Sequence, residues 1–151
     1  MKEYWTVESK DYGLHFSSKD QIENSKGQMI SAVTLDMEGP VETPEGVTTK
    51  DAVEDNLDNI LRTTPVNPHF KPSFPIGEGF GGAIVDINGQ EVGFIEYEVL
   101  SDNIIFVRHG IIIKEQKMYA FTMIFFDPKV DRKKGMYMEM LIIAAVNSGK
   151  L

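Results

Sequence analysis

The chain has 151 residues, of which 42% are hydrophobic and 25% are charged, close to the averages for globular proteins. This length suits one domain with a sizeable core. There is no cysteine, which excludes disulfides, zinc–thiolate sites and cysteine nucleophiles. The formal net charge of −8 argues against a nucleic-acid partner, because phosphates would be repelled. We therefore expect residues 1–151 to form a single acidic domain.

The N-terminal sequence bears on location. Residues 1–5 read Met-Lys-Glu-Tyr-Trp and pass directly into a strand-like pattern without an apolar signal core. The longest apolar runs, Ile111–Ile113 and Met140–Val146, are far shorter than the roughly 20 residues that a membrane-spanning helix needs. We expect a cytoplasmic protein without a transmembrane segment. If a leader has been removed from the chain, the protein is instead exported or lipid-anchored.

Short strands are predicted near the N-terminus. The patterns at Tyr4–Val7, Tyr12–Phe16 and Met29–Met37 are typical of strands, and the polar stretch Asn24–Gly27 predicts a turn before the third of them. The segment Gly39–Gly46 holds two prolines and two glutamates, which predicts an exposed loop. The chain is therefore expected to begin as part of a sheet.

The clearest helix is predicted over Thr48–Arg62. Thr48 suits the N-cap, and Asp51 lies in the first turn, where the helix dipole favours a carboxylate. Four apolar residues recur at helical spacing and predict one buried stripe, formed by Val53, Leu57, Ile60 and Leu61. We expect this helix to lie on the sheet.

A proline-rich connection follows the helix. Four prolines in Thr63–Pro75 predict an extended segment. The glycine cluster at positions 77–82 lacks the lysine and Ser/Thr of a phosphate-binding loop, so we expect it to let the chain turn into the sheet. Long ordered loops are often functional. Phe70, Phe74 and Phe80 are therefore candidates either to plug the core or to present a recognition surface.

The next segments predict a meander of antiparallel strands. The dipeptide at 88–89, Asn-Gly, is a strong hairpin signal, because both positions tolerate positive φ. A turn at Ser101–Asn103 sets Leu100 opposite Ile104 and Glu96 opposite Arg108, a favourable cross-strand ion pair. The internal consistency of this pairing supports the predicted register.

A three-residue turn at Glu115–Lys117 is expected to continue the same scheme. It sets Phe121 opposite Ile111 and Met123 opposite His109 on one apolar face. Large apolar groups also lie on the opposite face, and such groups are rarely left in water. We therefore expect both faces of the sheet to be covered.

A second helix is predicted from about Asp131 to a stop at Ser148-Gly149. Its apolar residues repeat at helical spacing and predict a buried stripe that contains Tyr137, Met140, Leu141, Ala144 and Ala145. Met136 and Met138 are harder to bury together. Methionine suits both core filling and adaptable binding surfaces. The predicted architecture is an α+β domain in which helices flank an antiparallel sheet.

Candidate catalytic groups are sparse. The three histidines, His15, His69 and His109, lack metal-ligand spacing, and no Gly-x-Ser-x-Gly elbow occurs. Glu96 and Glu98 share one face of a strand, as in a carboxylate active site, but Arg108 can neutralise Glu96 and solvent can surround Glu98. We expect a non-enzymatic protein with no cofactor and no metal. An enzyme using these glutamates or His109 would need a cleft that holds them.

Four stretches together carry a family resemblance: TTKDAVEDNLDNIL, GGAIVDINGQEVGFIEYEV, IIFVRHGIIIKEQKMYAFTMIFF and AAVNSGKL. In this order they resemble the PsbP-like superfamily, which includes photosystem PsbP proteins, Ran-binding Mog proteins, DcrB-like bacterial proteins and the Eag chaperones of type VI secretion effectors. The resemblance implies an α/β/α sandwich and a role in binding, docking or chaperoning. It carries over no functional residue. Cystatin-like and nuclear-transport-factor-like folds are the alternatives.

Two hypotheses for function follow. The first is a binding or adaptor module that engages a protein or peptide through an apolar surface rimmed by charge. Its candidate residues are Met136, Met138, Phe70, Phe74 and Phe80. The second is a small-ligand-binding domain with a pocket between sheet and helix, lined by Tyr97, Phe121, Met123 and His109.

Overall fold

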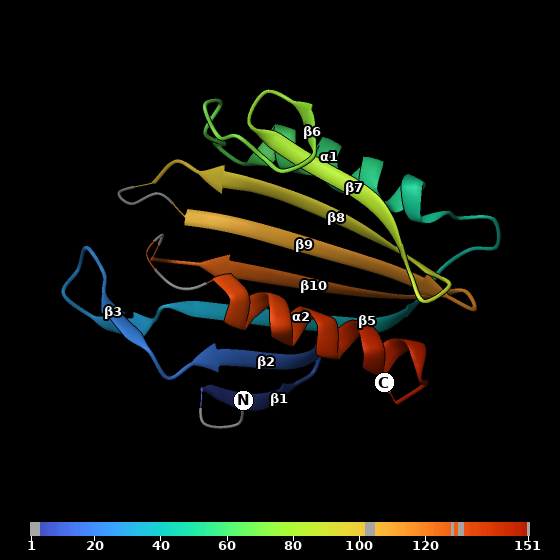
Figure 1. Ribbon diagram of the computed structural model, residues 1–151, viewed down its shortest axis with the longest axis horizontal. Coiled ribbons are helices and arrows are strands. Elements are labelled where there is room, and N and C mark those ends of the chain that lie inside the picture. The colour runs from blue at the N-terminus through green and yellow to red at the C-terminus, as the bar shows by residue number, and fades with distance from the viewer. Residues whose placement is uncertain (1–3, 102–104, 128, 130–131, 151) are drawn as a thin grey trace.

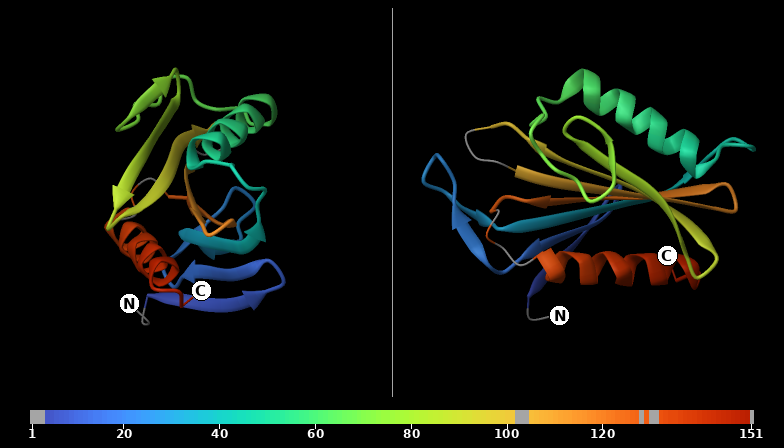
Figure 2. Two further views of the ribbon diagram at one scale, coloured as in Figure 1. Left: turned by 90° about the vertical axis from the view of Figure 1, so that its right-hand side faces the viewer. Right: turned by 45° about the horizontal axis from the view of Figure 1, so that its top comes forward.

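The computed structural model describes residues 4–101, 105–127, 129 and 132–150. In this part of the chain, an eight-stranded antiparallel sheet carries one helix on each face, and two further strands form a separate hairpin (Figures 1 and 2). The predicted α+β class, an antiparallel sheet flanked by helices, is confirmed. The pairing of Leu100 with Ile104, most of the Ser101–Asn103 turn and a helix start at Asp131 lie outside the described residues.

The described strands belong either to the main sheet or to the separate hairpin. The sheet contains β1 (Trp5–Lys10), β2 (Gly13–Ser18), β5 (Val33–Glu42), β6 (Pro75–Gly77), β7 (Phe80–Ile87), β8 (Gln90–Val99), β9 (Ile105–Lys114) and β10 (Lys117–Phe125). The hairpin pairs β3 (Gln21–Glu23) with β4 (Met29–Ser31), and the helices are α1 (Thr49–Thr63) and α2 (Arg132–Asn147). The order of strands across the sheet is β1-β2-β5-β10-β9-β8-β7-β6.

Two predictions for the N-terminal part are wrong. The expected strand Met29–Met37 is interrupted at Ala32, so that β4 pairs with β3 whereas β5 joins the main sheet. The expected loop Gly39–Gly46 is strand as far as Glu42, which pairs with Lys117 of β10. β2 pairs with β5 only as far as Glu38, so Pro40 lies where one edge of β5 is unpaired. The pairing of β5 with β10 has a bulge nearby, and proline is found in strands at such edges and bulges.

Helix α1 begins as predicted. The Asp51 N–H donates to the Thr48 hydroxyl at 3.1 Å, and the Thr48 N–H donates to the Asp51 carboxylate at 3.0 Å, which completes a capping box. Val53 and Ile60 are buried against the sheet. Leu61, the last member of the predicted stripe, is instead exposed.

The register of the β8–β9 pair is as predicted. Glu96 pairs with Arg108 and Tyr97 with Val107, and the preceding turn has positive φ at Asn88 and Gly89. Both conformations are those that a two-residue hairpin turn requires. This central pair therefore assigns its side chains to the two faces as the sequence indicated.

The predicted β9–β10 register is wrong by one residue. The turn contains only Glu115 and Gln116, both with positive φ, so Phe121 pairs with Gly110. Side chains alternate between the faces of a strand, and a slip of one residue therefore moves every side chain to the other face. Phe121 and Met123 consequently belong to the core beneath α2. Non-glycine residues rarely adopt positive φ, which is why the sequence suggested a longer turn.

The two faces of the sheet carry separate cores. α1 packs over β8 and β9, whereas the sheet curves around α2 on the other face (Figure 2). The α2 core draws its side chains from both halves of the sheet, including Trp5 of β1 and Val92 of β8. Gly135 lets α2 approach β10, since a Cβ there would lie 2.6 Å from Met123 Sδ and 2.8 Å from Phe125 Cζ.

We expect the substitution Gly110→Ala to destabilise the fold. A Cβ at position 110 would lie 1.9 Å from Phe121 Cζ, and overpacking of a core costs about 1–3 kcal/mol. Urea denaturation followed by circular dichroism measures the loss. Gly77→Ala is the matched control, because nothing lies within 4 Å of its added Cβ. Equal stability of the two variants would contradict the described packing.

Candidate functional site

Helix α2 turns its only carboxylate toward the sheet. Glu139 is buried, with 3% of its surface exposed, and two nitrogens of Arg108 hold it. The Arg108 Nε donates to Glu139 Oε2 at 2.7 Å, and the Nη2 donates to Oε1 at 3.2 Å. Burial raises the pKa of Glu139 above its ordinary value, although the Arg108 guanidinium opposes that change. The bidentate pair fixes one face of α2 inward.

Arg108 also binds a second carboxylate. Its Nη1 donates to Glu96 Oε2 at 3.2 Å, and the Ser73 N–H donates to Glu96 Oε1 at 2.7 Å. The guanidinium lies 4.5 Å from the centre of the Phe94 ring. A single arginine therefore links β8, β9, α2 and the proline-rich loop. Because Glu96 is occupied in this network, it does not stand free in a cleft with His109.

The outer face of α2 is apolar. Because Glu139 faces inward, four large side chains lie on the side away from the sheet, and each is between 43% and 52% exposed. They are Met136, Tyr137, Met140 and Leu141. We call these four residues the α2 surface. The predicted burial of Tyr137, Met140 and Leu141 is wrong, since the sheet-facing residues include Met138, Ile142 and Val146 instead. Of the two candidate methionines, Met136 is exposed and Met138 lies in the core.

Positive charge gathers where α2 begins. Lys129, Arg132, Lys133 and Lys134 are all exposed. Cations in the first turn of a helix oppose the helix dipole, so this arrangement does not stabilise α2 by itself. Part of the charge is engaged within the chain, because the Arg132 guanidinium lies 4.1 Å from the Phe106 ring centre and the Lys134 ammonium 4.2 Å from that of Tyr4. The α2 surface thus has a cationic end.

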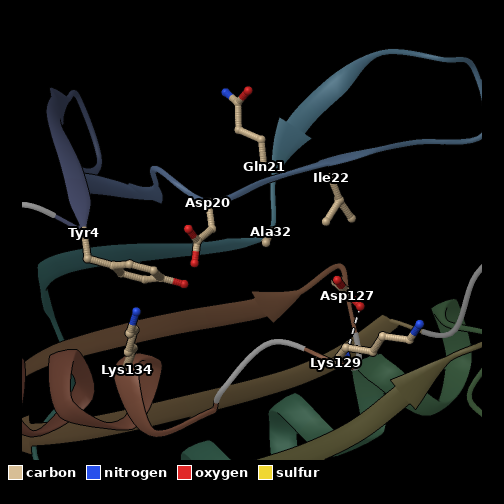
Figure 3. A pocket seen from close by; sticks show the side chains of 8 residues that line it. All are labelled: Tyr4, Asp20, Gln21, Ile22, Ala32, Asp127, Lys129 and Lys134. Carbon is tan, nitrogen blue, oxygen red and sulfur yellow. Dashed lines mark hydrogen bonds between the residues drawn. The ribbon is translucent and has the colours of Figure 1, made fainter.

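A cavity of about 370 Å³ adjoins this end of α2 (Figure 3). It is lined by Tyr4, Asp20, Gln21, Ile22, Ala32, Asp127, Lys129 and Lys134. The lining contains two carboxylates and two ammonium groups, so their charges balance. The cavity therefore offers no strong attraction for an anion or a cation.

The three phenylalanines proposed for partner binding lie in different environments. Phe80 is buried in the α1 core, and Phe70 is partly buried with its ring centre 5.7 Å from that of Phe106. Phe74 is exposed. Two of the three therefore plug the core, and only Phe74 is available at the surface.

The four residues expected to line one pocket between sheet and helix do not lie on the same face of the sheet. Tyr97 and His109 lie on the α1 face, whereas Phe121 and Met123 are buried on the α2 face. The Tyr97 hydroxyl and His109 Nε2 are hydrogen-bonded at 2.8 Å, and His109 Nδ1 is 3.0 Å from the Thr122 hydroxyl. Burial lowers the pKa of His109 to about 4 and raises that of Tyr97 to about 12. These groups are neutral at neutral pH and hold the strands together.

The part of the α1 face that α1 leaves uncovered is polar. There Asp36 accepts hydrogen bonds from the Tyr12 hydroxyl and from His15 Nδ1, the latter at 2.7 Å. The hydrogen bond to Asp36 raises the pKa of Tyr12 to about 12. This region is the wet face of an antiparallel sheet. Within the described ranges, no group of three or more acidic, histidine or cysteine side chains could hold a metal ion.

Comparisons with known proteins show a similar fold in one solved structure but do not identify a family for this chain. No family model matches the chain, and no curated protein matches it. Its structure is similar to the crystal structure of PA94, a protein of unknown function from Pseudomonas aeruginosa, with a TM-score of 0.51 over 91% of this chain and 94% of that one. The two sequences are 10% identical, so the likeness shows a shared fold alone. Neither described helix is long and apolar enough to cross a bilayer.

We expect Arg108→Met to destabilise the protein by about 3–5 kcal/mol, because it leaves two buried carboxylates without their counter-ion. Adding Glu139→Gln should recover part of the loss, since it removes one of the uncompensated charges. Arg62→Met, at an exposed arginine, should stay within about 0.5 kcal/mol of the wild type. Urea denaturation at neutral pH measures all three, and a near-neutral effect of Arg108→Met would contradict the network.

Protonation of His109 should couple stability to pH. Its pKa is about 4 in the folded chain and 6.5 as a free side chain, so only the unfolded chain takes up the proton between these values. Stability is therefore lost as the pH falls from 6.5 to 4, by at most about 3 kcal/mol at 1.36 kcal/mol per pKa unit. His109→Gln should lose less over this range in urea denaturation at each pH. Parallel curves for both proteins would exclude His109 as the cause.

Proposed function

We propose that this chain is a non-enzymatic binding or adaptor module that engages a protein or peptide partner through the α2 surface. One observation carries the proposal: α2 buries its only carboxylate and exposes four large apolar side chains. A helix that is apolar on all sides is normally covered on all sides. The exposed side of α2 therefore needs a cover that the described chain does not supply.

The composition of the α2 surface suits recognition. Methionine adapts its shape to a partner, and Met136 and Met140 supply two flexible side chains. Tyrosine combines apolar area with a polar tip and is enriched at the energetic centres of interfaces. Full burial of a large apolar side chain is worth about 1.5–3 kcal/mol, so a partner covering all four half-exposed groups gains substantial binding free energy.

The cationic end of α2 indicates the chemistry of the partner. Lys129, Arg132, Lys133 and Lys134 are exposed where α2 begins, and complementary charge gives an interface its orientation. We infer a partner helix with an apolar stripe that packs along α2 and with acidic residues near the α2 N-terminus. The net charge of −8 disfavours a nucleic acid in this role.

Two further considerations support binding rather than catalysis. The resemblance to the PsbP-like superfamily, whose known members mostly bind, dock or chaperone, supports it by analogy. Within the chain, Glu96 is held by Arg108 and Ser73, and Glu98 accepts a hydrogen bond from the Asn67 amide at 2.9 Å. Both carboxylates therefore have structural roles that need no substrate.

The test combines affinity capture with direct binding. The wild type and Met136→Ser/Met140→Ser are used to capture partners from cells that make the protein. Any protein recovered by the wild type is then purified and titrated against both forms. We expect the double variant to bind about tenfold more weakly or worse, as for truncation of central interface residues. Circular dichroism checks that it folds.

Met29→Ser is the matched control, because Met29 is 59% exposed on the separate hairpin. It should bind like the wild type. If the double variant folds and binds every recovered partner with wild-type affinity, the α2 surface is not the docking site. Sedimentation of both proteins alone distinguishes a partner of another kind from a second copy of this chain.

A further inference from the structure

An apolar depression lies between α1 and the edge strand β6, on the face of the sheet opposite α2. Its volume is about 290 Å³, near the lower end of the range for ligand sites. It is lined by Glu54, Leu57, Asp58, Leu61, Ile76, Gly77, Glu78 and Phe80. We call this depression the α1–β6 groove. It shares no residue with the α2 surface.

The walls of the groove are apolar. Leu57 and Leu61 are one helical turn apart on α1, and Ile76 faces them from β6. Leu61 and Ile76 are each more than half exposed, whereas Phe80 forms a buried floor. The apolar stripe predicted for α1 is thus wider than the area that the sheet covers. Its last member, Leu61, lines the groove, where it is open to contact with apolar side chains of another molecule.

The rim of the groove is acidic. Glu54, Asp58 and Glu78 contribute three carboxylates, and none of the lining residues carries a positive charge. The nearest described ion pair is weak, because Lys50 Nζ is 3.9 Å from Glu54 and both side chains are exposed. The Arg62 Nε donates to the main-chain oxygen of Asp58. An occupant with positive charges beside its apolar groups would match this rim.

The edge position of β6 favours an extended occupant. β6 is the last strand of the sheet and pairs with β7 among the described strands. Extended segments from other chains bind along the edges of sheets. β6 is only three residues long and begins with Pro75, so the groove beside it, more than main-chain pairing, holds the occupant. Side chains alternate in such a segment, so apolar groups can face the groove while the residues between them meet the carboxylates at its rim.

We propose that the α1–β6 groove is a separate docking site for an extended cationic segment of another protein, in which apolar residues alternate with lysine or arginine. The site is acidic, whereas the α2 surface has a cationic end. The two sites therefore select partners of opposite charge on opposite faces of the sheet. This proposal does not depend on the α2 surface being occupied.

The test uses three labelled peptides and fluorescence anisotropy. In the first peptide leucine alternates with lysine, in the second leucine alternates with glutamate, and in the third serine alternates with lysine. We expect only the first to bind, and its affinity to fall as salt screens the carboxylates. Backbone NMR shifts on adding it should change in α1 and β6.

Variants then locate the site. Asp58→Lys/Glu78→Lys should weaken binding of the leucine–lysine peptide at least about tenfold. Asp11→Lys/Glu45→Lys makes the same change of net charge at exposed carboxylates elsewhere and should leave the affinity near that of the wild type. Equal losses in both variants, equal binding of the glutamate peptide, or NMR shifts confined to α2 would each overturn the proposal. Circular dichroism confirms that both variants fold.

Discussion

The ion pair between Arg108 and Glu139 determines how α2 sits on the sheet. Arg108 projects from the middle of β9 and is held by Glu96 on the neighbouring strand. It therefore offers its remaining nitrogens at one place beneath the helix. A buried carboxylate without a counter-ion is costly, so α2 is restricted to the rotation that brings Glu139 to that place. Gly135, one turn earlier, permits the close approach to β10 that this rotation requires.

The rotation of α2 about its own axis decides which of its side chains are exposed. Residues 136–146 of α2 are apolar on every side apart from Glu139, and burying one side necessarily exposes the other. The strands cannot cover both sides, because the sheet curves around the inner one (Figure 2). The opposite face shows the same imbalance on α1, whose apolar stripe extends to Leu61 beyond the reach of the strands. Both proposed docking surfaces thus include apolar side chains of a helix that the sheet does not cover.

Local chemistry could be predicted from the sequence, and the relative placement of distant segments could not. The capping box of Thr48 and Asp51 and the turn at Asn88 and Gly89 depend on neighbours in the chain, and both are present. The β9–β10 register depended on the length of one turn. Glu115 and Gln116 both adopt a conformation that side chains disfavour, and that single deviation exchanged the faces of Phe121 and Met123. It also placed Phe121 and Met123 on the face of the sheet opposite Tyr97 and His109, with which they were expected to line a pocket.

The sequence by itself determined the class of fold, the central β8–β9 pairing and its Glu96–Arg108 contact, because these follow from alternation, helical spacing and turn residues. Only the tertiary structure decided which side of α2 is buried. Apolar residues recur at helical spacing on more than one side of α2, so periodicity does not choose between its sides. The choice rests on one long-range ion pair, between residues 108 and 139. The tertiary structure therefore also decided that Met136 is exposed and Met138 is buried, although the two are only two positions apart and identical in chemistry.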